Sequence, residues 1–179
     1  MDICKAKWTI LETEIFNLLC LKTGEKLSQR DIAKYLNVSP TAVGNSMKKL
    51  YDEEIINIEK LKNINLISIN RENKKVKQLK KVTNLKFIYV SGLLDFLEES
   101  LAGSSIILFG SYARGEDIYS SDIDIAVIGR KKKDMKIKEF EKILNKNITL
   151  NFYDSWKEIN KHLKNNILNG ILLSGGVDI

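Results

Sequence analysis

The sequence contains few of the residue types that most often build small chemical sites. It has two cysteines, one histidine and one proline in 179 residues. Cys4 and Cys20 form no CxxC pair, and no group of histidines accompanies them, so we expect neither a zinc site nor a disulfide. No apolar run approaches the roughly 20 residues that a membrane span needs. The N-terminal stretch MDICKAKWTILETE also lacks a long apolar signal core, so we expect a cytoplasmic protein without a membrane partner.

The hydrophobic content is sufficient for a folded chain, and the charged residues and glycines are unevenly distributed along it. Hydrophobic residues make up 44% of the sequence, which supports a packed core. The net charge is +6, and residues 71–86 hold seven Lys or Arg against one Glu. A basic excess suits a polyanionic partner, and a solvated helix face explains it equally well. Most glycines follow residue 100, which predicts a change in architecture there.

The first part of the chain is predicted to form short helices followed by a strand pair. Apolar residues at positions 11, 15, 18, 19 and 21 fall on one helical face. Ser28 is expected to cap a second helix, and Ser39 a third helix with Pro40 at its first position. Residues 55–59 and 64–69 alternate as two strands joined by a polar turn.

This order of elements is that of a winged helix-turn-helix. Residues 28–56, SQRDIAKYLNVSPTAVGNSMKKLYDEEII, resemble the helix-turn-helix of many bacterial and archaeal transcription regulators. In such domains one helix enters the major groove, so the resemblance implies DNA binding. The candidate DNA-facing residues are small or polar: Ser39, Thr41, Ala42, Asn45, Ser46 and Lys48. The alternative is a helical bundle that docks another protein or pairs into a homodimer.

Residues 73–101 are predicted to form a helical connector. Apolar residues recur at near-helical spacing between positions 76 and 97. This pattern fits one long helix, or two helices with a break near Ser91 and Gly92. The lysines of the connector either contact phosphate groups or only keep the helix soluble.

A tight turn follows the next predicted strand. Residues 106–109 are a four-residue apolar run between Gly103 and Gly110, which is typical of a buried strand. Gly110 and Ser111 then turn the chain into a predicted short helix. A glycine lets the backbone approach a ligand closely, and N–H groups at a helix start suit a phosphate oxygen.

Two aspartates lie in the strand predicted over residues 122–128. Alternation places Asp122 and Asp124 on one face and the neighbouring apolar residues on the other. Burying two unpaired carboxylates so close together is expensive. They must be solvated, paired with a base or bound to a cation, and carboxylates that share Mg²⁺ with phosphates fit this pattern.

The spacing of these residues resembles that of the DNA polymerase β-like nucleotidyltransferase superfamily. Gly110 and Ser111 are followed by ten residues, Asp122, one residue and Asp124. GSYARGE and SDIDIAV are closest to the minimal nucleotidyltransferases of archaea and bacteria, and HLKNNILNGILL resembles their closing helix. The resemblance covers about residues 100–174 and implies an α+β fold with a small mixed sheet. The predicted domains are a winged helix-turn-helix over 1–72, a helical connector over 73–101 and a nucleotidyltransferase domain over 102–179.

The resemblance also implies a reaction and its residues. Gly110, Ser111 and Arg114 would bind ATP or another nucleoside triphosphate, although a surface salt bridge also explains Arg114. Asp122 and Asp124 would be catalytic and would bind Mg²⁺ ions. A nucleotide, AMP in the case of ATP, would pass to a protein or small-molecule hydroxyl, with release of pyrophosphate. Minimal nucleotidyltransferases often act as antitoxins that modify a HEPN-type toxin, so that partner class is implied too.

The sequence departs from the superfamily at an expected third carboxylate. In active members a later strand carries an acid that helps to bind metal and removes the proton of the acceptor hydroxyl. The strand NITLNFYD places Asn151 there, and alternation points Asp154 to the opposite face unless a bulge re-aims it. A missing general base typically costs about 10²–10⁴-fold in rate. The domain is therefore either a slow or specialised transferase, or the nucleotide-sensing part of a DNA-binding regulator.

Overall fold

The structure is a computed structural model, and it describes residues 8–177. The chain divides into two compact units between Val76 and Lys77. This boundary lies inside a helix and differs from the predicted domain limits at residues 72 and 101. Within residues 8–177, no helix is long and apolar enough to cross a membrane. Cys20 is buried in the first unit, and Cys4 lies outside the described residues.

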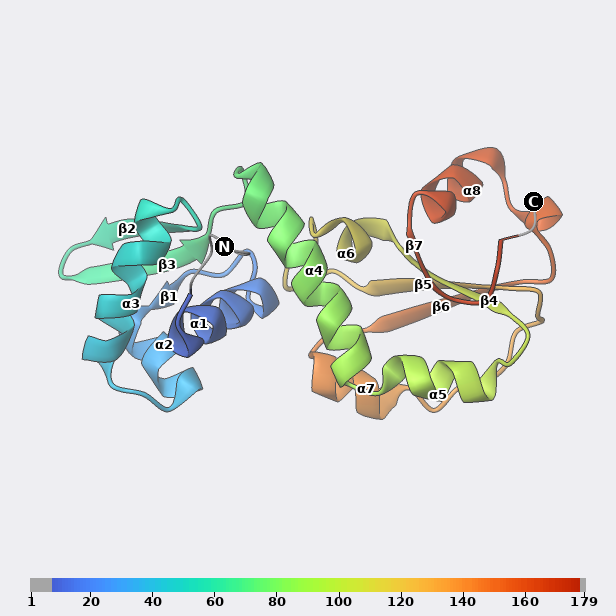
Figure 1. The fold of residues 1–179 in the computed structure, drawn as a ribbon, viewed down its shortest axis with the longest axis horizontal. Helices are drawn as coiled ribbons and strands as arrows, with labels where there is room; N and C mark the ends of the chain where they lie inside the picture. The colour runs from blue at the N-terminus through green and yellow to red at the C-terminus, as the bar shows by residue number, and fades with distance from the viewer. Residues whose placement is uncertain (1–7, 178–179) are drawn as a thin grey trace, which may run out of the picture. The chain divides into compact units, whose positions relative to one another are not determined.

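The first unit has the order of elements expected of a winged helix (Figure 1). Its three strands form one antiparallel sheet in the order β1-β3-β2. The two-residue strand β1 was not predicted, because a strand this short leaves no alternating pattern. The elements are α1 (Ile10–Leu21), β1 (Leu27–Ser28), α2 (Gln29–Leu36), α3 (Pro40–Asp52), β2 (Ile56–Leu61) and β3 (Ile64–Ile69).

Side-chain caps define where the helices of the first unit begin. Ser28 and Asp31 form a reciprocal capping box at α2, since each side chain accepts the other residue's backbone N–H. Ser39 accepts the Ala42 N–H at the start of α3. Asn37 ends α2 in the left-handed conformation, with φ of 54°. Each cap contributes about 1 kcal/mol, so the short α2–α3 turn is fixed by local sequence.

The second unit contains a small mixed sheet, which confirms the predicted fold class. The sheet order is β6-β5-β4-β7, in which β5 and β6 are parallel and the other pairs are antiparallel. The elements are α4 (Lys74–Val90, which begins before the boundary), α5 (Leu93–Ser100), β4 (Ser105–Phe109), α6 (Gly110–Arg114), β5 (Ile123–Ile128), α7 (Lys138–Leu144), β6 (Ile148–Tyr153), η1 (Trp156–Glu158), α8 (Lys161–Leu168) and β7 (Ile171–Ser174).

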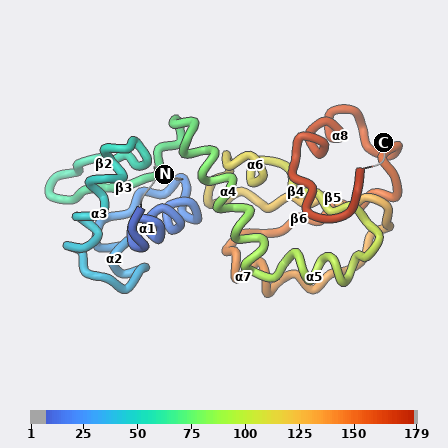
Figure 2. Tube along the Cα trace, in the orientation of Figure 1, coloured from blue at the N-terminus to red at the C-terminus, as the bar shows by residue number. Residues whose placement is uncertain are grey.

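Helices cover both faces of this sheet. Figures 1 and 2 show α8 on one side of the strands and α5 and α7 on the other. Ile123, Ile125 and Val127 of β5 pack into the core on the α5 side, whereas Ala126 and Ile128 pack on the α8 side. The strand alternation therefore sorts the side chains of β5 between two apolar layers.

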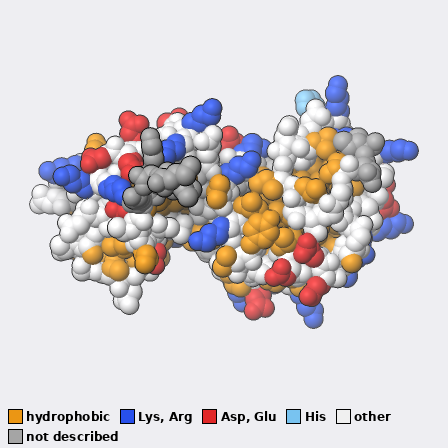
Figure 3. All heavy atoms as spheres, viewed as in Figure 1, with side chains coloured by type: hydrophobic (Ala, Val, Ile, Leu, Met, Phe, Trp, Pro, Cys, Tyr) orange, Lys and Arg blue, Asp and Glu red, His pale blue; other side chains and the backbone are white. Residues whose placement is uncertain are grey.

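The predicted connector forms two helices that take part in the core of the second unit. The break lies at Gly92, which has φ of 75°. Ile88 of α4 and Leu97 of α5 are fully buried in that core. Val82 and Val90 of α4 are exposed, and Figure 3 shows hydrophobic side chains on the surface of this unit. These helices are thus part of the domain rather than a solvated linker.

Candidate nucleotide and metal site

A glycine turn brings the end of β4 against the carboxylates of β5. Phe109, the last residue of β4, pairs with Asp124 in the antiparallel register. Gly110 follows with φ of 75°, and a Cβ atom there would collide with Asp124 Oδ2. The position thus needs glycine for two reasons, the left-handed backbone and the close approach of a carboxylate. Ser111, in the first turn of α6, is half-buried next to this contact.

The two aspartates lie at the start of β5 in different environments. Asp122 is exposed, and Asp124 is half-buried. Burial raises the pKa of Asp124, the negative charge of Asp122 raises it further, and Arg114 partly opposes the shift. Among the described residues, no ion pair joins either carboxylate to a basic side chain. Two uncompensated carboxylates on one face fit the oxygen ligands that Mg²⁺ prefers.

Arg114 is held at the surface by other partners. Its Nε donates to Glu116 Oε2 at 2.8 Å, and its Nη1 donates to Asn166 Oδ1 at 3.2 Å. Its side chain is 46% exposed. Arg114 thus forms the surface salt bridge considered above, yet it remains close enough to Asp124 to lower the pKa of that carboxyl.

The register of β6 places two neutral residues on the face of the sheet that carries Asp124. Asn151 pairs with Ala126, so it lies one strand repeat beyond Asp124. Thr149 is the residue paired with Asp124, and it lies on the same face of β6 as Asn151. Asp154 follows the end of β6 and is exposed. Across residues 8–177, no group of three or more His, Cys, Asp or Glu side chains could hold a metal ion.

Asn147 contacts the site and was missed by the sequence analysis. Its Nδ2 donates to Asp122 Oδ1 at 3.2 Å, and its backbone carbonyl accepts the Ile123 N–H at 2.8 Å. Asn147 precedes β6 and lies far from Asp122 in the sequence, so no local motif indicates the contact. Only the parallel pairing of β5 with β6 brings the two residues together.

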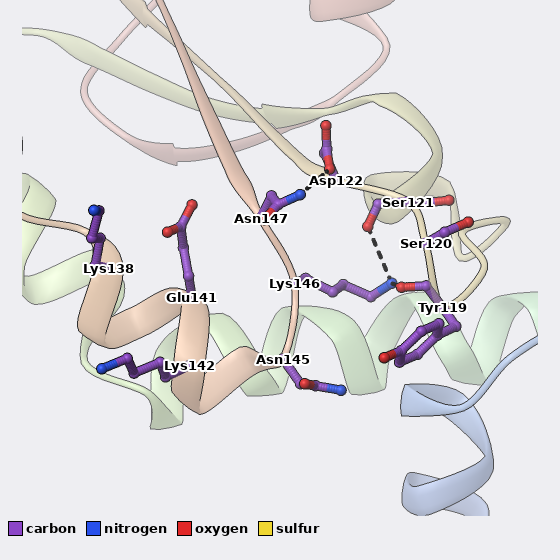
Figure 4. Close-up of a pocket in the computed structure, with 10 residues that line it drawn as sticks. All are labelled: Tyr119, Ser120, Ser121, Asp122, Lys138, Glu141, Lys142, Asn145, Lys146 and Asn147. Carbon is purple, nitrogen blue, oxygen red and sulfur yellow. Dashed lines mark hydrogen bonds between the residues drawn. The ribbon is translucent and has the colours of Figure 1, made fainter.

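A pocket of about 540 Å³ opens beside Asp122 (Figure 4). Lys138, Glu141 and Lys142 of α7 line one side, and residues 119–122 line the other. Figure 4 shows the Asn147 side chain directed toward Asp122 at the edge of this space. Asp122 lines this pocket, whereas Asp124, Gly110 and Ser111 do not, so the pocket is a space separate from the glycine turn.

The predicted DNA-facing residues lie at and after the start of α3. Ser39, Thr41, Asn45 and Lys48 are exposed, whereas Ala42 and Ser46 are half-buried. The Ser39 hydroxyl already accepts a backbone N–H as a helix cap. A pocket of about 430 Å³ is lined by Ser28 and the first residues of α2, by Pro40, and by residues 63–65 at the β2–β3 turn and the start of β3. The exposed face of α3 and the turn between β2 and β3 are thus both accessible to solvent in the first unit.

Comparison with protein families confirms the predicted resemblance to a nucleotidyltransferase domain preceded by a winged helix. The family model described as nucleotidyltransferase domain matches residues 90–173. The model of the MarR family matches residues 10–63. The nucleotidyltransferase match begins at the end of α4, before β4 and the site described above, and ends in β7. No curated protein matches the chain.

Two similar solved structures each match about half of this chain. A single-site mutant of ZitR from Lactococcus lactis is 23% identical, with 54% of this chain and 64% of that chain covered and a TM-score of 0.41. The adhesin competence repressor AdcR from Streptococcus pyogenes is 19% identical, with 55% and 71% covered and a TM-score of 0.42. The chain thus spans just under two thirds of the length of the first of these proteins.

Proposed function

We propose that the protein is a Mg²⁺-dependent nucleotidyltransferase that also binds DNA. The match of residues 90–173 to the nucleotidyltransferase domain and of residues 10–63 to the MarR family supports this proposal. The donor is a nucleoside triphosphate, with ATP as the first candidate. The contact between the Gly110 turn and Asp124 carries the proposal. It joins a backbone turn suited to phosphate with a carboxylate suited to metal.

Each site residue has a distinct task in this proposal. The backbone at Gly110 and the Ser111 hydroxyl hold phosphate oxygens of the donor. Asp122 and Asp124 hold Mg²⁺, which when bound neutralises charge on the attacking and leaving oxygens. Arg114 favours the ionised form of Asp124, because its charge partly opposes the rise in pKa that burial causes. The acceptor oxygen attacks the α-phosphorus of the donor, the bond to the β-phosphate breaks, and pyrophosphate leaves.

The acceptor loses its proton without help from a carboxylate on β6. Thr149 and Asn151, on the same face of β6 as Asp124, are both neutral. The proton therefore passes to water or to a group of the acceptor, which predicts slow turnover. We propose a protein hydroxyl as the acceptor, and the HEPN-type toxin implied by the resemblance is the first partner to test.

Transfer of label from α-labelled ATP tests this proposal. The native chain is incubated with Mg²⁺ and candidate acceptors, and labelled products and pyrophosphate are measured. Replacement of both aspartates, Asp122→Ala with Asp124→Ala, should abolish both products. Undiminished transfer by that variant would refute the assigned mechanism, and no transfer or nucleotide binding by the native chain would refute the assigned activity.

A second candidate function is a DNA-binding regulator whose C-terminal domain only senses nucleotide. The neutral residues Thr149 and Asn151 favour it, because they leave the metal site incomplete for chemistry. It predicts DNA binding that weakens steeply with salt and is unaffected by loss of the two aspartates. Lys48→Ala should weaken binding to all duplexes and lower the salt slope by about 1. Fluorescence anisotropy with labelled duplexes at several salt concentrations measures this DNA binding. Because the first function also includes DNA binding, the absence of label transfer from α-labelled ATP is what distinguishes the second function from it.

A further inference from the structure

A buried lysine donates hydrogen bonds to several backbone carbonyls of the loop before β5, residues 118–121. Lys146 is 7% exposed and lies in the turn between α7 and β6. Its Nζ donates to the backbone carbonyls of Ile118 at 2.6 Å, Ser121 at 3.3 Å and Tyr119 at 3.4 Å. Figure 4 shows the bond to Ser121, immediately before Asp122. One ammonium group thus holds three of the four residues that precede the first carboxylate.

The same loop is held from a second side through Asp117. The Asp117 carboxylate is completely buried, and its Oδ2 lies 3.2 Å from Lys146 Nζ. Its Oδ1 accepts from Lys80 Nζ at 2.5 Å and from Asn84 Nδ2 at 2.7 Å, both on α4. Asp117 is held by its bonds to α4. Lys146 contacts both Asp117 and the following loop carbonyls, so it connects residues 118–121 to Asp117.

Lys146 also fixes the residue that contacts the carboxylate. Asn147, the next residue, donates to Asp122 Oδ1 and accepts the Ile123 N–H through its carbonyl. Asn147 is exposed, so no packing around its side chain orients it. Its position follows from Lys146 on one side and from the pairing of β6 with β5 on the other.

From this arrangement we infer that Lys146 is a positioning residue for the metal-binding carboxylate Asp122, acting through the loop carbonyls and through Asn147. The inference rests on the proposed function. A metal ion binds tightly only where its ligands are already held in position. Mutation of the residues that hydrogen-bond to the ligands typically lowers metal affinity by about 10- to 100-fold. Simple structural stabilisation by Lys146 would instead leave metal affinity unchanged in any variant that folds.

Metal and nucleotide binding, measured separately on the full chain, test the inference. Mn²⁺ binding is followed by electron paramagnetic resonance with a non-hydrolysable ATP analogue present. Binding of a fluorescent ATP analogue is measured in EDTA. Lys146→Met should weaken Mn²⁺ binding by at least about 10-fold, with metal-free nucleotide binding changed less than about twofold and a native circular dichroism spectrum. Lys142→Met is the matched control, because Lys142 lines the same pocket without a described contact to the loop.

Asn147→Ala keeps the test decisive if Lys146→Met does not fold. It removes only the contact with Asp122 from an exposed position, and it should weaken Mn²⁺ binding selectively by about 10-fold. Native affinity for Mn²⁺ in a folded Lys146→Met protein, or in Asn147→Ala, would overturn this inference and leave the proposed function intact. A native chain that binds no Mn²⁺ with nucleotide would overturn both.

Discussion

Asp124 and Thr149 lie directly opposite each other on the parallel strands β5 and β6. Neighbouring strands are about 4.8 Å apart, and opposed residues of a parallel pair direct their side chains to the same face. The site therefore has a neutral hydroxyl beside its more buried carboxylate. A single substitution at Thr149 can therefore test how a third carboxylate beside Asp124 affects metal binding.

Thr149→Asp is expected to strengthen metal binding. A carboxylate about 5 Å from a divalent ion near the protein surface should raise affinity by about 10-fold. Asn151→Asp is the matched control, because it places the same charge one strand repeat further away. Titration with Mn²⁺ should rank the affinities as Thr149→Asp, then Asn151→Asp, then the native chain. Equal affinities for the two variants would mean that register does not decide where the third ligand belongs.

Asp124→Asn should change stability with opposite signs in the absence and presence of metal. The pKa of Asp124 is raised from its ordinary value of 3.8, so the folded chain holds this proton more tightly than the unfolded chain does. Without metal, the ionised group therefore destabilises the fold as the pH rises through the raised pKa. Asparagine should increase the free energy of unfolding at pH 7, by less than about 1 kcal/mol because the group is partly solvated.

Thermal unfolding from pH 4 to pH 7 measures this effect. The difference between native and Asp124→Asn proteins should grow as the pH rises without metal. With Mg²⁺ and nucleotide the native chain should become the more stable of the two, since only the native site binds the ion well. Asp134→Asn, at an exposed aspartate, controls for the loss of one charge. A pH-independent difference would show that Asp124 does not titrate as its surroundings indicate.

Gly110→Ala should damage the site more than an equally strained substitution elsewhere. Gly110 and Gly92 both have φ of 75°, so an alanine at either position costs about 1–2 kcal/mol of backbone strain. A Cβ at Gly110 would also collide with Asp124, whereas nothing lies within 4 Å of a Cβ at Gly92. Both variants should lose stability in denaturant unfolding, and only Gly110→Ala should lose Mn²⁺ binding. Retention of metal binding by Gly110→Ala would show that Asp124 can shift without consequence.

The parts of the site that sequence predicts are those that depend on local pattern. Alternation in SDIDIAVI places Asp122 and Asp124 on one face, and the structure shows the apolar neighbours of these residues packed on the opposite side. Ser28 and Ser39 cap α2 and α3 as predicted, because capping involves residues only three apart. These features follow from backbone geometry within a few residues.

The parts that sequence could not predict depend on contacts between distant segments. The register of β6 against β5 decides whether Thr149 or Asn151 lies beside Asp124, and alternation within β6 is compatible with both. Lys80 is one of the lysines of residues 71–86 that composition assigns to solvent or phosphate. The structure buries its ammonium against Asp117, 37 residues away. A charge pattern does not reveal which of several lysines faces a buried carboxylate.

Lys80→Met is expected to cost far more stability than its position in a lysine-rich segment implies. The side chains of Lys80 and Asp117 are 3% and 0% exposed, and Lys80 Nζ bonds both the carboxylate and the backbone carbonyl of Asp117. Lys80→Met leaves the Asp117 backbone carbonyl without this donor and the carboxylate with only Asn84 and Lys146, which costs about 1–3 kcal/mol. Lys81→Met, at the exposed neighbouring position, should change the free energy of unfolding by less than about 0.5 kcal/mol.

Urea unfolding of the two variants distinguishes the buried lysine from the surface one. The transition of the second unit should move to lower urea in Lys80→Met and stay in place in Lys81→Met. Asp117→Asn with Lys80→Met should not restore the loss, because it also removes the carboxylate partner of the buried Lys146 ammonium. If Lys80→Met alone were as stable as the native chain, the pair would contribute no net stability, and the remaining bonds from Asn84 and Lys146 would suffice to hold the loop before Asp122.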